Sequence, residues 1–384
     1  MKKWVIVVVV VATLWLIAGV AAYVSLRQAS SLPDVVKSME QVPGAEGGDW
    51  PATWSPDGQR ILCGSHGVLT INADGTDEVY LGEGDCPVWS PDGSRIAFAT
   101  DNGLEVMNTD GGKRRLLVDL AKILSPLSID KRVESTAWSP DGSKIAFEAW
   151  AFVPDPSDSS EQTGESVDDM WIVNVDGSGM TQLTTDSEGV RDLVWSPDGQ
   201  RIAFVSSRNG GRVDIWTSKV DGTDLQQLTS SEAQDFDVSW SPDGSKIAFA
   251  SGYSPDKEED PEIWIMDSDG SNKVQLTKGS ESYEKPAWSP DGAMIAFSST
   301  RLGPLGDIWV MNADGSGKTR LTRTSHSSFT CTSKEICYQE PQWSPDGTKL
   351  MFPNMLTQWE GWGSSSTRWD RLWVMELNLE KGLS

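Results

Sequence analysis

The sequence predicts an all-β fold, a seven-bladed β-propeller built from four-stranded blades. The first observation is that the pentapeptide Trp-Ser-Pro-Asp-Gly occurs seven times, and the second is that its copies are 35, 49, 57, 45, 48 and 55 residues apart. Propeller blades repeat with similar periods. The third is a turn-rich composition, with 36 glycines and 20 prolines in 384 residues. The copies begin at Trp54, Trp89, Trp138, Trp195, Trp240, Trp288 and Trp343.

The pentapeptide is predicted to be the hairpin turn between the first two strands of each blade. Proline fixes φ at the first corner of a type I turn, aspartate tolerates the second corner, and glycine supplies the positive φ that closes the hairpin. The run after the turn is Ile-Ala-Phe in five copies, as at residues 145–147. Its large residues lie two apart, as on one face of a strand.

A second set of turns predicts a third and a fourth strand in each blade. An apolar run with a tryptophan, such as residues 308–311, precedes an Asp-Gly pair in most repeats. Asp-Gly between apolar stretches is a strong hairpin signal. In the later blades the fourth strand ends in Leu-Thr, as at Leu321 and Thr322. The Asp-Gly turns begin at Asp74, Asp110, Asp176, Asp221, Asp269 and Asp314.

The N-terminal part of the domain is predicted to complete the last blade. After the third strand of that blade only residues 376–384 remain, which is too little for a turn and a full outer strand. Residues 34–42 stand about as far before the first pentapeptide as the other fourth strands stand before theirs. We therefore expect this strand to close the ring and to remove its open edge.

A transmembrane helix is expected ahead of the propeller. Two lysines precede residues 4–24, an uncharged apolar run of 21 residues that is long enough to cross a bilayer. We expect residues 1–29 to be an uncleaved signal anchor and residues 30–384 to be the propeller, which would lie outside the cytoplasm. Cleavage of a signal peptide near residues 18–22, giving a secreted or periplasmic protein, is the alternative.

The longest insertions are predicted on one face of the ring, because strand direction places the loops between second and third strands together there. These are residues 151–169, 252–261, 323–340 and 353–370. Variable loops on a rigid scaffold commonly carry function. Five tryptophans outside the repeats fall in this face and are predicted to bind a ligand by stacking or as interface anchors; the alternative is that they pack only within their own loops. They are Trp50, Trp150, Trp359, Trp362 and Trp369.

Two acidic loops could supply oxygen ligands to calcium. They are residues 155–169 and 256–262. Neither has the spacing of a helix-loop-helix calcium site, and their serine and charge content is typical of solvated loops. No cofactor is therefore expected.

The four cysteines are predicted to form two disulfides in an exported chain. Cys63 and Cys86 lie near one face in neighbouring blades, whereas Cys331 and Cys337 share one loop. Other pairings would have to reach across blades.

Catalytic signatures are scarce. The chain has two histidines, His66 and His326, and has no Gly-x-Ser-x-Gly, His-Glu-x-x-His or phosphate-binding glycine motif. The formal charge of -24 argues against a nucleic-acid partner, because phosphate backbones require clusters of lysine and arginine.

The repeat units resemble those of TolB-like proteins, also called WD40-like or PD40 repeats. The resemblance covers about residues 34–384 and implies a β-propeller that serves as a protein-binding platform. The chain departs from that family's six-bladed propeller and separate α/β domain. Some lyases acting on pectin fragments are similar propellers, but their metal sites resemble histidine clusters that this chain does not supply. The hydrolase domain that follows the repeats in prolyl-oligopeptidase-like peptidases is not found after the last blade.

The expected function is that of a membrane-anchored, extracytoplasmic scaffold that binds a protein or glycan of the cell envelope without chemistry of its own. The alternative is a propeller hydrolase or lyase that acts on a carbohydrate with loop carboxylates such as Asp168 and Asp169 as acid and base. Paired carboxylates in a closed pocket would favour the enzyme.

Overall fold

The computed structural model describes eleven stretches of the chain, and the fold is built from these. The side chains of residues 354–360 and 364–371 are not among the features described. The stretches are residues 33–43, 52–64, 67–155, 163–185, 189–208, 212–253, 260–279, 281–299, 306–322, 340–360 and 364–378.

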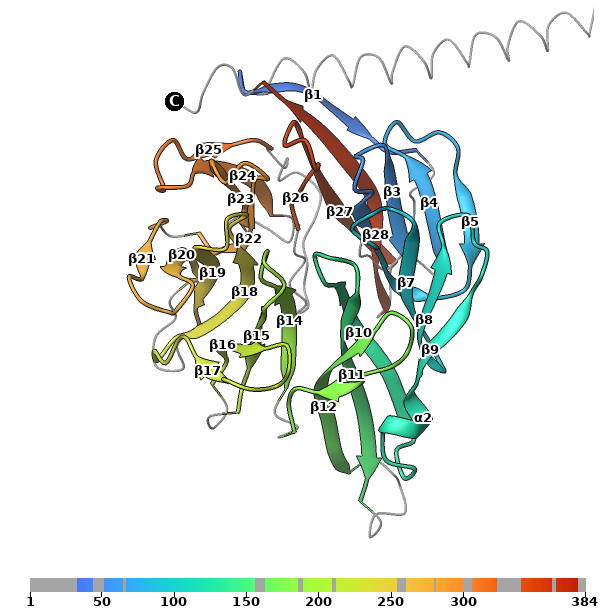
Figure 1. Ribbon diagram of the computed structural model, residues 1–384. Coiled ribbons are helices and arrows are strands. Elements are labelled where there is room, and N and C mark those ends of the chain that lie inside the picture. Colours follow the sequence, from blue (N-terminus) through green and yellow to red (C-terminus); the bar gives the residue numbers. More distant parts are fainter. Residues whose placement is uncertain are drawn as a thin grey trace, which may run out of the picture.

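The described residues form seven four-stranded antiparallel sheets arranged as the blades of a ring (Figure 1). The predicted seven-bladed propeller is confirmed. Each first strand ends on the tryptophan of a pentapeptide: β2 (Ala52–Trp54), β6 (Asp85–Trp89), β10 (Asp130–Trp138), β14 (Val190–Trp195), β18 (Gln234–Trp240), β22 (Tyr283–Trp288) and β26 (Gln342–Trp343). The second strands are β3 (Arg60–Gly64), β7 (Arg95–Thr100), β11 (Lys144–Pro154), β15 (Arg201–Ser206), β19 (Lys246–Gly252), β23 (Met294–Ser299) and β27 (Lys349–Glu360).

The third and fourth strands complete the blades, which are numbered 1 to 7 in chain order. The third strands are β4 (Val68–Asn72), β8 (Gly103–Asn108), β12 (Gly164–Asn174), β16 (Asp214–Lys219), β20 (Glu262–Asp267), β24 (Asp307–Asn312) and β28 (Ser364–Leu377). The fourth strands are β5 (Val79–Gly82), β9 (Arg115–Asp119), β13 (Thr181–Gln182), β17 (Gln226–Gln227), β21 (Val274–Gln275), β25 (Thr319–Arg320) and β1 (Val36–Gln41). A short helix, α2 (Leu120–Ile123), follows β9 and is capped by the Asp119 side chain.

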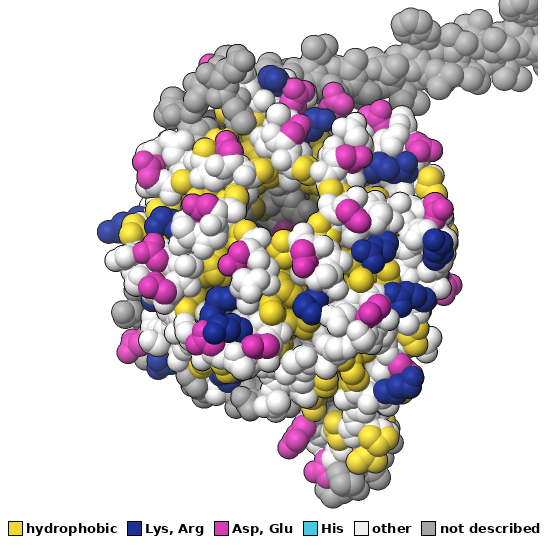
Figure 2. Space-filling model, viewed as in Figure 1, with side chains coloured by type: hydrophobic (Ala, Val, Ile, Leu, Met, Phe, Trp, Pro, Cys, Tyr) yellow, Lys and Arg dark blue, Asp and Glu magenta, His cyan; other side chains and the backbone are white. Residues whose placement is uncertain are grey.

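The first strands of neighbouring blades contact one another, so they surround the axis of the ring. The motif tryptophans join the blades there: the indole Nε1 atoms of Trp138 and Trp195 donate hydrogen bonds to the carbonyl oxygens of Val88 and Ala137 in the preceding blades. Figure 2 shows one face of the molecule, with acidic and basic side chains interspersed around a central hollow.

The core lies between the blades. The phenylalanines of the Ile-Ala-Phe runs are buried in it, and each pairs across its sheet with a third-strand residue, as Phe249 does with Trp264. Burial of a large apolar side chain on each second strand stabilises the folded ring by about 1.5–3 kcal/mol per residue.

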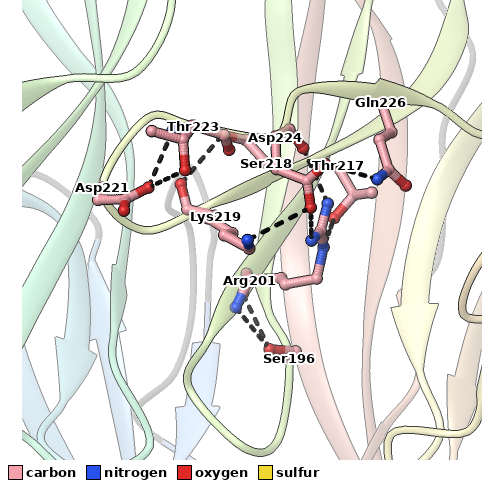
Figure 3. A network of polar contacts seen from close by, with 9 residues as sticks. All are labelled: Ser196, Arg201, Thr217, Ser218, Lys219, Asp221, Thr223, Asp224 and Gln226. Atoms are coloured by element: carbon pink, nitrogen blue, oxygen red, sulfur yellow. Dashed lines mark hydrogen bonds and ion pairs between the residues drawn. The ribbon is translucent and has the colours of Figure 1, made fainter.

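The pentapeptide forms the predicted turn, and its serine and aspartate hold it closed. In blade 4 the Ser196 hydroxyl donates to Asp198 and accepts from the backbone N–H of Arg201. The Arg201 guanidinium reaches the second turn of the blade, where it pairs with Asp224 and donates to Thr217 (Figure 3). The hydroxyl of the motif serine lowers the pKa of the following aspartate, to about 2 for Asp92 and Asp243. Blades 1 to 6 therefore have two such turns each, and blade 7, whose fourth strand is β1, has the pentapeptide turn.

Two long loops expected on the insertion-rich face are partly strands. β11 and β12 continue as a paired ribbon to Pro154 and Gly164, and β27 and β28 do so to Glu360 and Ser364. The prediction of loops over residues 151–169 and 353–370 is therefore wrong for most of their length. Cross-strand pairing satisfies backbone groups that an irregular loop would leave to solvent.

The N-terminal strand lies in the seventh blade. β1 pairs antiparallel with β28, and Val35 and Val36 are buried in the core of that blade. In the part of the chain that the structure describes, no helix combines the length and apolarity needed to cross a membrane. The apolar run at residues 4–24 lies outside those residues.

Candidate functional site

Two carboxyl groups meet inside blade 3. Glu148 on β11 and Asp168 on β12 share a hydrogen bond between their side chains, and the Ser135 hydroxyl on β10 donates to Glu148 Oε2 at 3.1 Å. Glu148 is buried and pairs with Met170, which packs against blade 4. Since side chains alternate along a strand, Glu148 and Asp168 face blade 4 as well.

The pair holds a proton at neutral pH. Burial, the Asp168 charge and the hydrogen bond to Asp168 raise the pKa of Glu148 to about 9. Burial also raises the pKa of Asp168, to about 6, and this rise is opposed by the hydrogen bond with Glu148 and by Arg191 of blade 4. Two close carboxyl groups in a water-poor site commonly divide into an acid and a base in this way.

Asp169, the predicted partner of Asp168, has a structural role instead. It is buried and accepts hydrogen bonds from Gln182 and Thr184 on the fourth-strand side of the blade. Asp214 makes the same contacts with Gln227 and Thr229 in blade 4. The acid at this repeat position therefore fastens the outer strand, and Glu148 takes the place that we expected Asp169 to fill.

A row of charged residues continues around the axis from blade 4 to blade 7. Asp192, Asp237 and Lys285 each stand at a β-bulge, three residues before the motif tryptophan, and each has a positive φ. The backbone N–H of Asp237 donates to Asp192 and that of Lys285 donates to Asp237. The Lys285 Nζ atom lies 2.8 Å from Asp237 and 3.0 Å from Glu340.

The bulges place strained residues at the centre of the ring. A lysine with positive φ costs about 1–3 kcal/mol, and such outliers persist where the surrounding structure holds them, commonly at functional sites. Burial raises the pKa of Asp237 to about 6, although Lys285 opposes the rise. The pKa of Lys285 is raised well above its ordinary value by Asp237 and Glu340, despite burial.

A cavity of about 270 Å³ lies beside this row, and we call it the axial cavity. It is lined by Arg191, Asp192, Phe236, Asp237, Tyr253 and Lys285, among others. The rings of Phe236 and Tyr253 stack with centroids 5.8 Å apart. Arg191 lines the cavity and also lowers the pKa of Asp168 through its charge, so this arginine links the axial cavity to the carboxyl pair electrostatically.

A third buried carboxyl group adjoins the axial cavity. The Tyr253 hydroxyl donates to Glu284 Oε1 at 2.8 Å, and Glu284 Oε2 is buried with no hydrogen-bond partner among the described residues. Burial raises the pKa of Glu284 to about 7. A buried acceptor without a partner can receive a hydrogen bond from a ligand.

The predicted tryptophans have different positions. Trp150 lies on β11 opposite Asp168, half-buried, with the Arg132 guanidinium 3.8 Å from its ring centroid. Trp359 and Trp369 lie on β27 and β28. Trp50 and Trp362 lie outside the described residues. The structure thus brings Trp150, of these five, next to the carboxyl pair.

The disulfide predicted between Cys63 and Cys86 is not formed, and both thiols are free. Cys63 packs into the core shared with the seventh blade, whereas the Cys86 thiol, on a bulge with positive φ, donates to the carbonyl of Glu134 in blade 3. The two sulfur atoms therefore lie in different interfaces. Cys331 and Cys337 lie outside the described residues.

The two acidic loops proposed to bind calcium lie only partly within the described residues. Most of the second acidic loop, residues 254–259, and residues 156–162 of the first lie outside the described residues. Of the remainder, Glu262 accepts hydrogen bonds from Thr277 and from the backbone N–H of Gly279, so it is used within the blade.

The sequence analysis did not predict three residues of the site, Glu148, Asp237 and Lys285. For Glu148 the sequence does contain a signal, which is a departure from the repeat. The residue after the phenylalanine of the second strand is Ala99, Val205, Ala250 or Ser298 in other blades and is glutamate in blade 3 alone of these. A comparison of the repeats position by position would have singled it out.

The fold and the repeats define a propeller of the TolB type. A family model described as the TolB beta propeller domain matches residues 137–325 and 239–361. The chain belongs to this family. No curated protein sequence matches it.

Solved structures of similar fold include two oligogalacturonate lyases and a peptidase. A structure described as oligogalacturonate lyase in complex with manganese has a TM-score of 0.64 at 16% identity, covering 85% of this chain and 88% of that one. The oligogalacturonate lyase of Vibrio parahaemolyticus has a TM-score of 0.65 at 12% identity, with 90% and 95% covered. An acylaminoacyl peptidase of Pyrococcus horikoshii has a TM-score of 0.54 at 13% identity, covering 85% of this chain but 52% of its own.

These comparisons contradict the expectation of a scaffold without chemistry of its own. The two lyases are enzymes that match this chain over most of their own length, in agreement with the alternative of a hydrolase or lyase. At these identities the likeness shows the fold, so the reaction has to be argued from the site.

Proposed function

We propose that the protein is an enzyme that cleaves an acidic carbohydrate at the axial cavity, with Glu148 and Asp168 as its acid and base. The observation that carries this proposal is the buried carboxyl pair, which holds one proton between a pKa of about 6 and a pKa of about 9. Such perturbed pairs concentrate at catalytic sites.

The geometry favours a lyase over a hydrolase. Glycosidases hold their two carboxyl groups about 5–5.5 Å or about 6.5–9.5 Å apart, on either side of the bond that breaks. Glu148 and Asp168 hydrogen-bond to each other, which leaves no room for a glycosidic bond between them. An elimination needs a base at the proton and an acid at the departing oxygen, and two adjacent carboxyl groups can supply both where these atoms lie on the same face of the sugar ring.

In that elimination the ionised Asp168 removes the proton on the carbon next to a uronate carboxylate. The electron pair forms a carbon–carbon double bond as the glycosidic carbon–oxygen bond breaks, and Glu148 donates its proton to the departing oxygen. Arg191 is exposed, its charge acts on Asp168, and it supplies positive charge for the uronate carboxylate, which becomes more electron-rich in the transition state. The axial cavity then receives the neighbouring sugar.

Manganese, which one of the similar lyases contains, does not fit the described residues. Among them, no group of three or more His, Cys, Asp or Glu side chains is placed to hold a metal ion. The roles proposed above belong to side chains alone.

The reaction class can be tested with oligogalacturonate as the first probe. The purified full chain is incubated with the oligosaccharide, and both the ultraviolet absorbance of unsaturated uronides and the number of reducing ends are followed. A lyase increases both together. New reducing ends without absorbance would indicate a hydrolase, and no change with oligogalacturonate or with other uronate oligosaccharides would contradict the proposal.

We also propose that β1 closes the propeller ring and that residues 1–29 anchor it to a membrane, with the propeller outside the cytoplasm. The pairing of β1 with β28 supports the first statement and the uncharged run at residues 4–24 supports the second. The proposed partners are the membrane and a glycan of the cell envelope. Protease added to cells with a permeable wall should digest the propeller; protection until lysis would contradict this topology.

A further inference from the structure

A second cavity lies in blade 5, away from the carboxyl pair, and we call it the blade 5 cavity. Its volume is about 470 Å³, within the range of small-molecule sites. It is lined by Phe249, Trp264, Asp235, Ser251, Thr229 and Lys273, among others. An aromatic wall with hydroxyl, carboxylate and ammonium groups above it is typical of sites that bind polar rings.

The neighbouring blade shows what ordinarily fills this space. Asp235 precedes its motif tryptophan by five residues and pairs with Ser251; in blade 6 Tyr283 has the same spacing and pairs with Ser299. The backbone N–H groups of Asp235 and Tyr283 also make the same hydrogen bond, to Val213 and Pro261 respectively. Asp235 and Tyr283 are therefore equivalent positions in the repeat.

In blade 6 the space is occupied by the ring of Tyr283. This ring lies edge-on to Phe297, with centroids 5.6 Å apart, and edge-on to Trp309 at 6.2 Å. The Lys318 Nζ atom lies 4.4 Å from the ring centroid and 3.1 Å from the tyrosine hydroxyl. Phe249, Trp264 and Lys273 hold the corresponding positions in blade 5. The walls of a six-membered-ring site are thus retained in blade 5 while the ring itself is missing.

Asp235 is an unusual residue at such a position. Its counterparts in blades 3 and 4, Val133 and Val190, are buried apolar residues. Asp235 is 1% exposed, and its Oδ1 atom has no hydrogen-bond partner among the described residues. Burial raises its pKa, although hydrogen bonding by Ser251 and Thr229 opposes the rise. A carboxylate in place of a core side chain lowers stability unless a ligand satisfies it.

We propose that the blade 5 cavity binds a pyranose ring, which takes the place that the Tyr283 ring has in blade 6. The sugar ring packs against Trp264 and Phe249, and its hydroxyl groups donate to Asp235 and accept from Lys273. A plain aromatic ring would fill the space but would leave the Oδ1 atom of Asp235 without a donor, whereas a sugar offers several hydroxyls. A pyranose can therefore both pack against the aromatic residues of the cavity and hydrogen-bond to its charged residues.

This binding site is separate from the proposed catalytic site. Asp235 and Phe236 are consecutive residues of β18, so their side chains point to opposite faces of the sheet, and Phe236 lines the axial cavity instead. The proposal does not depend on the reaction at Glu148 and Asp168.

Saturation-transfer NMR on the full chain tests the proposal with three probes: methyl β-D-glucopyranoside, methyl β-D-galactopyranoside and phenol. At least one glycoside is expected to bind more tightly than phenol. Asp235→Tyr, which copies blade 6, is expected to weaken glycoside binding about tenfold or more, since the new ring fills the cavity. Asp235→Val, which copies blade 4, supplies a second variant in case the tyrosine disturbs folding.

Both variants should melt at or above the temperature of the parent protein, because each removes a buried carboxylate. The surface variant Glu376→Gln should keep the glycoside affinity. Glycoside binding is measured without turnover, so failure of the proposed catalysis would leave this result intact. Absence of glycoside binding, tighter binding of phenol, or equal glycoside affinity in both Asp235 variants and the parent would overturn the proposal.

Discussion

The carboxyl groups of Glu148 and Asp168 share a hydrogen bond inside blade 3, although 20 residues separate them in the sequence. The extended ribbon of β11 and β12 brings them together, since Asp168 pairs with Trp150, two residues from Glu148. Arg191 of the next blade lines the axial cavity and lowers the pKa of Asp168 through its charge. This contact is the basis of the predicted chemistry.

Glu148→Gln should make the folded protein less sensitive to alkaline pH. The folded-state pKa of Glu148 is about 9, above the ordinary value of 4.5, so the folded state keeps a proton that the unfolded state has lost. Stability therefore falls as pH rises from about 4.5 to about 9, by up to about 1.4 kcal/mol per pH unit for one proton. Glutamine has no such proton to lose.

Thermal melts at several pH values between about 5 and about 9 check this, because that interval lies between the unfolded and folded pKa values of Glu148. The exposed Glu376 provides a control, since Glu376→Gln should keep the parent slope. Equal slopes for Glu148→Gln and the parent protein would show that Glu148 is ionised in the folded state.

The pH dependence of kcat/KM should be bell-shaped. Activity rises as Asp168 ionises, with a pKa of about 6, and falls as Glu148 loses its proton, with a pKa of about 9. Both apparent pKa values of this profile describe the coupled pair and not either carboxyl group alone. Initial rates across this range measure the profile, and activity that rises continuously through pH 9 would rule out Glu148 as the acid.

Trp150→Ala should weaken substrate binding by about 2 kcal/mol, because this half-buried ring stands opposite Asp168 and can stack on a sugar. KM should rise while kcat changes little. A parallel variant, Trp216→Ala, removes a buried core ring and should lower the melting temperature through a loss of about 3–5 kcal/mol. An unchanged KM for Trp150→Ala would exclude Trp150 from the substrate-binding site. Ligand binding by Trp359, Trp362 and Trp369 stays a prediction.

Deletion of residues 30–43 should destabilise the entire propeller. It removes β1, which supplies the fourth strand of the seventh blade, and the buried Val42, which packs between that blade and the first. The loss should appear as a single lower melting transition in circular dichroism. A deletion ending at residue 29 is the control, and coincident melts of the two proteins would contradict the closure of the ring by β1.

The repeats were sufficient to predict the propeller, because each pentapeptide carries its own turn chemistry. Ser196, Asp198 and Arg201 hold one such turn with no help from distant residues, and the same contacts recur in the other blades. The site was harder to predict. Asp168 and Arg191 come from different blades, and the effect of the Arg191 charge on Asp168 depends on how the blades pack.

The incorrect predictions have physical causes of the same kind. The disulfide failed because Cys63 and Cys86 face different blade interfaces, which proximity in sequence does not reveal. Asp169 was chosen as a catalytic partner because it follows Asp168, but side chains alternate along a strand, so the two carboxyls point to opposite faces. Departures from the repeat, such as Glu148 and Asp235, were the better guide.

The central claim is tested most directly by the rate of unsaturated uronide formation from oligogalacturonate by the parent protein, Glu148→Gln, Asp168→Asn and the surface control Glu376→Gln. Removal of a general acid or base typically costs about 10²–10⁴-fold in rate. The first two variants should lose activity by at least about a hundredfold while remaining folded, and the control should keep the parent rate. Parent-like rates in Glu148→Gln and Asp168→Asn would contradict the assignment of this carboxyl pair as the catalytic site.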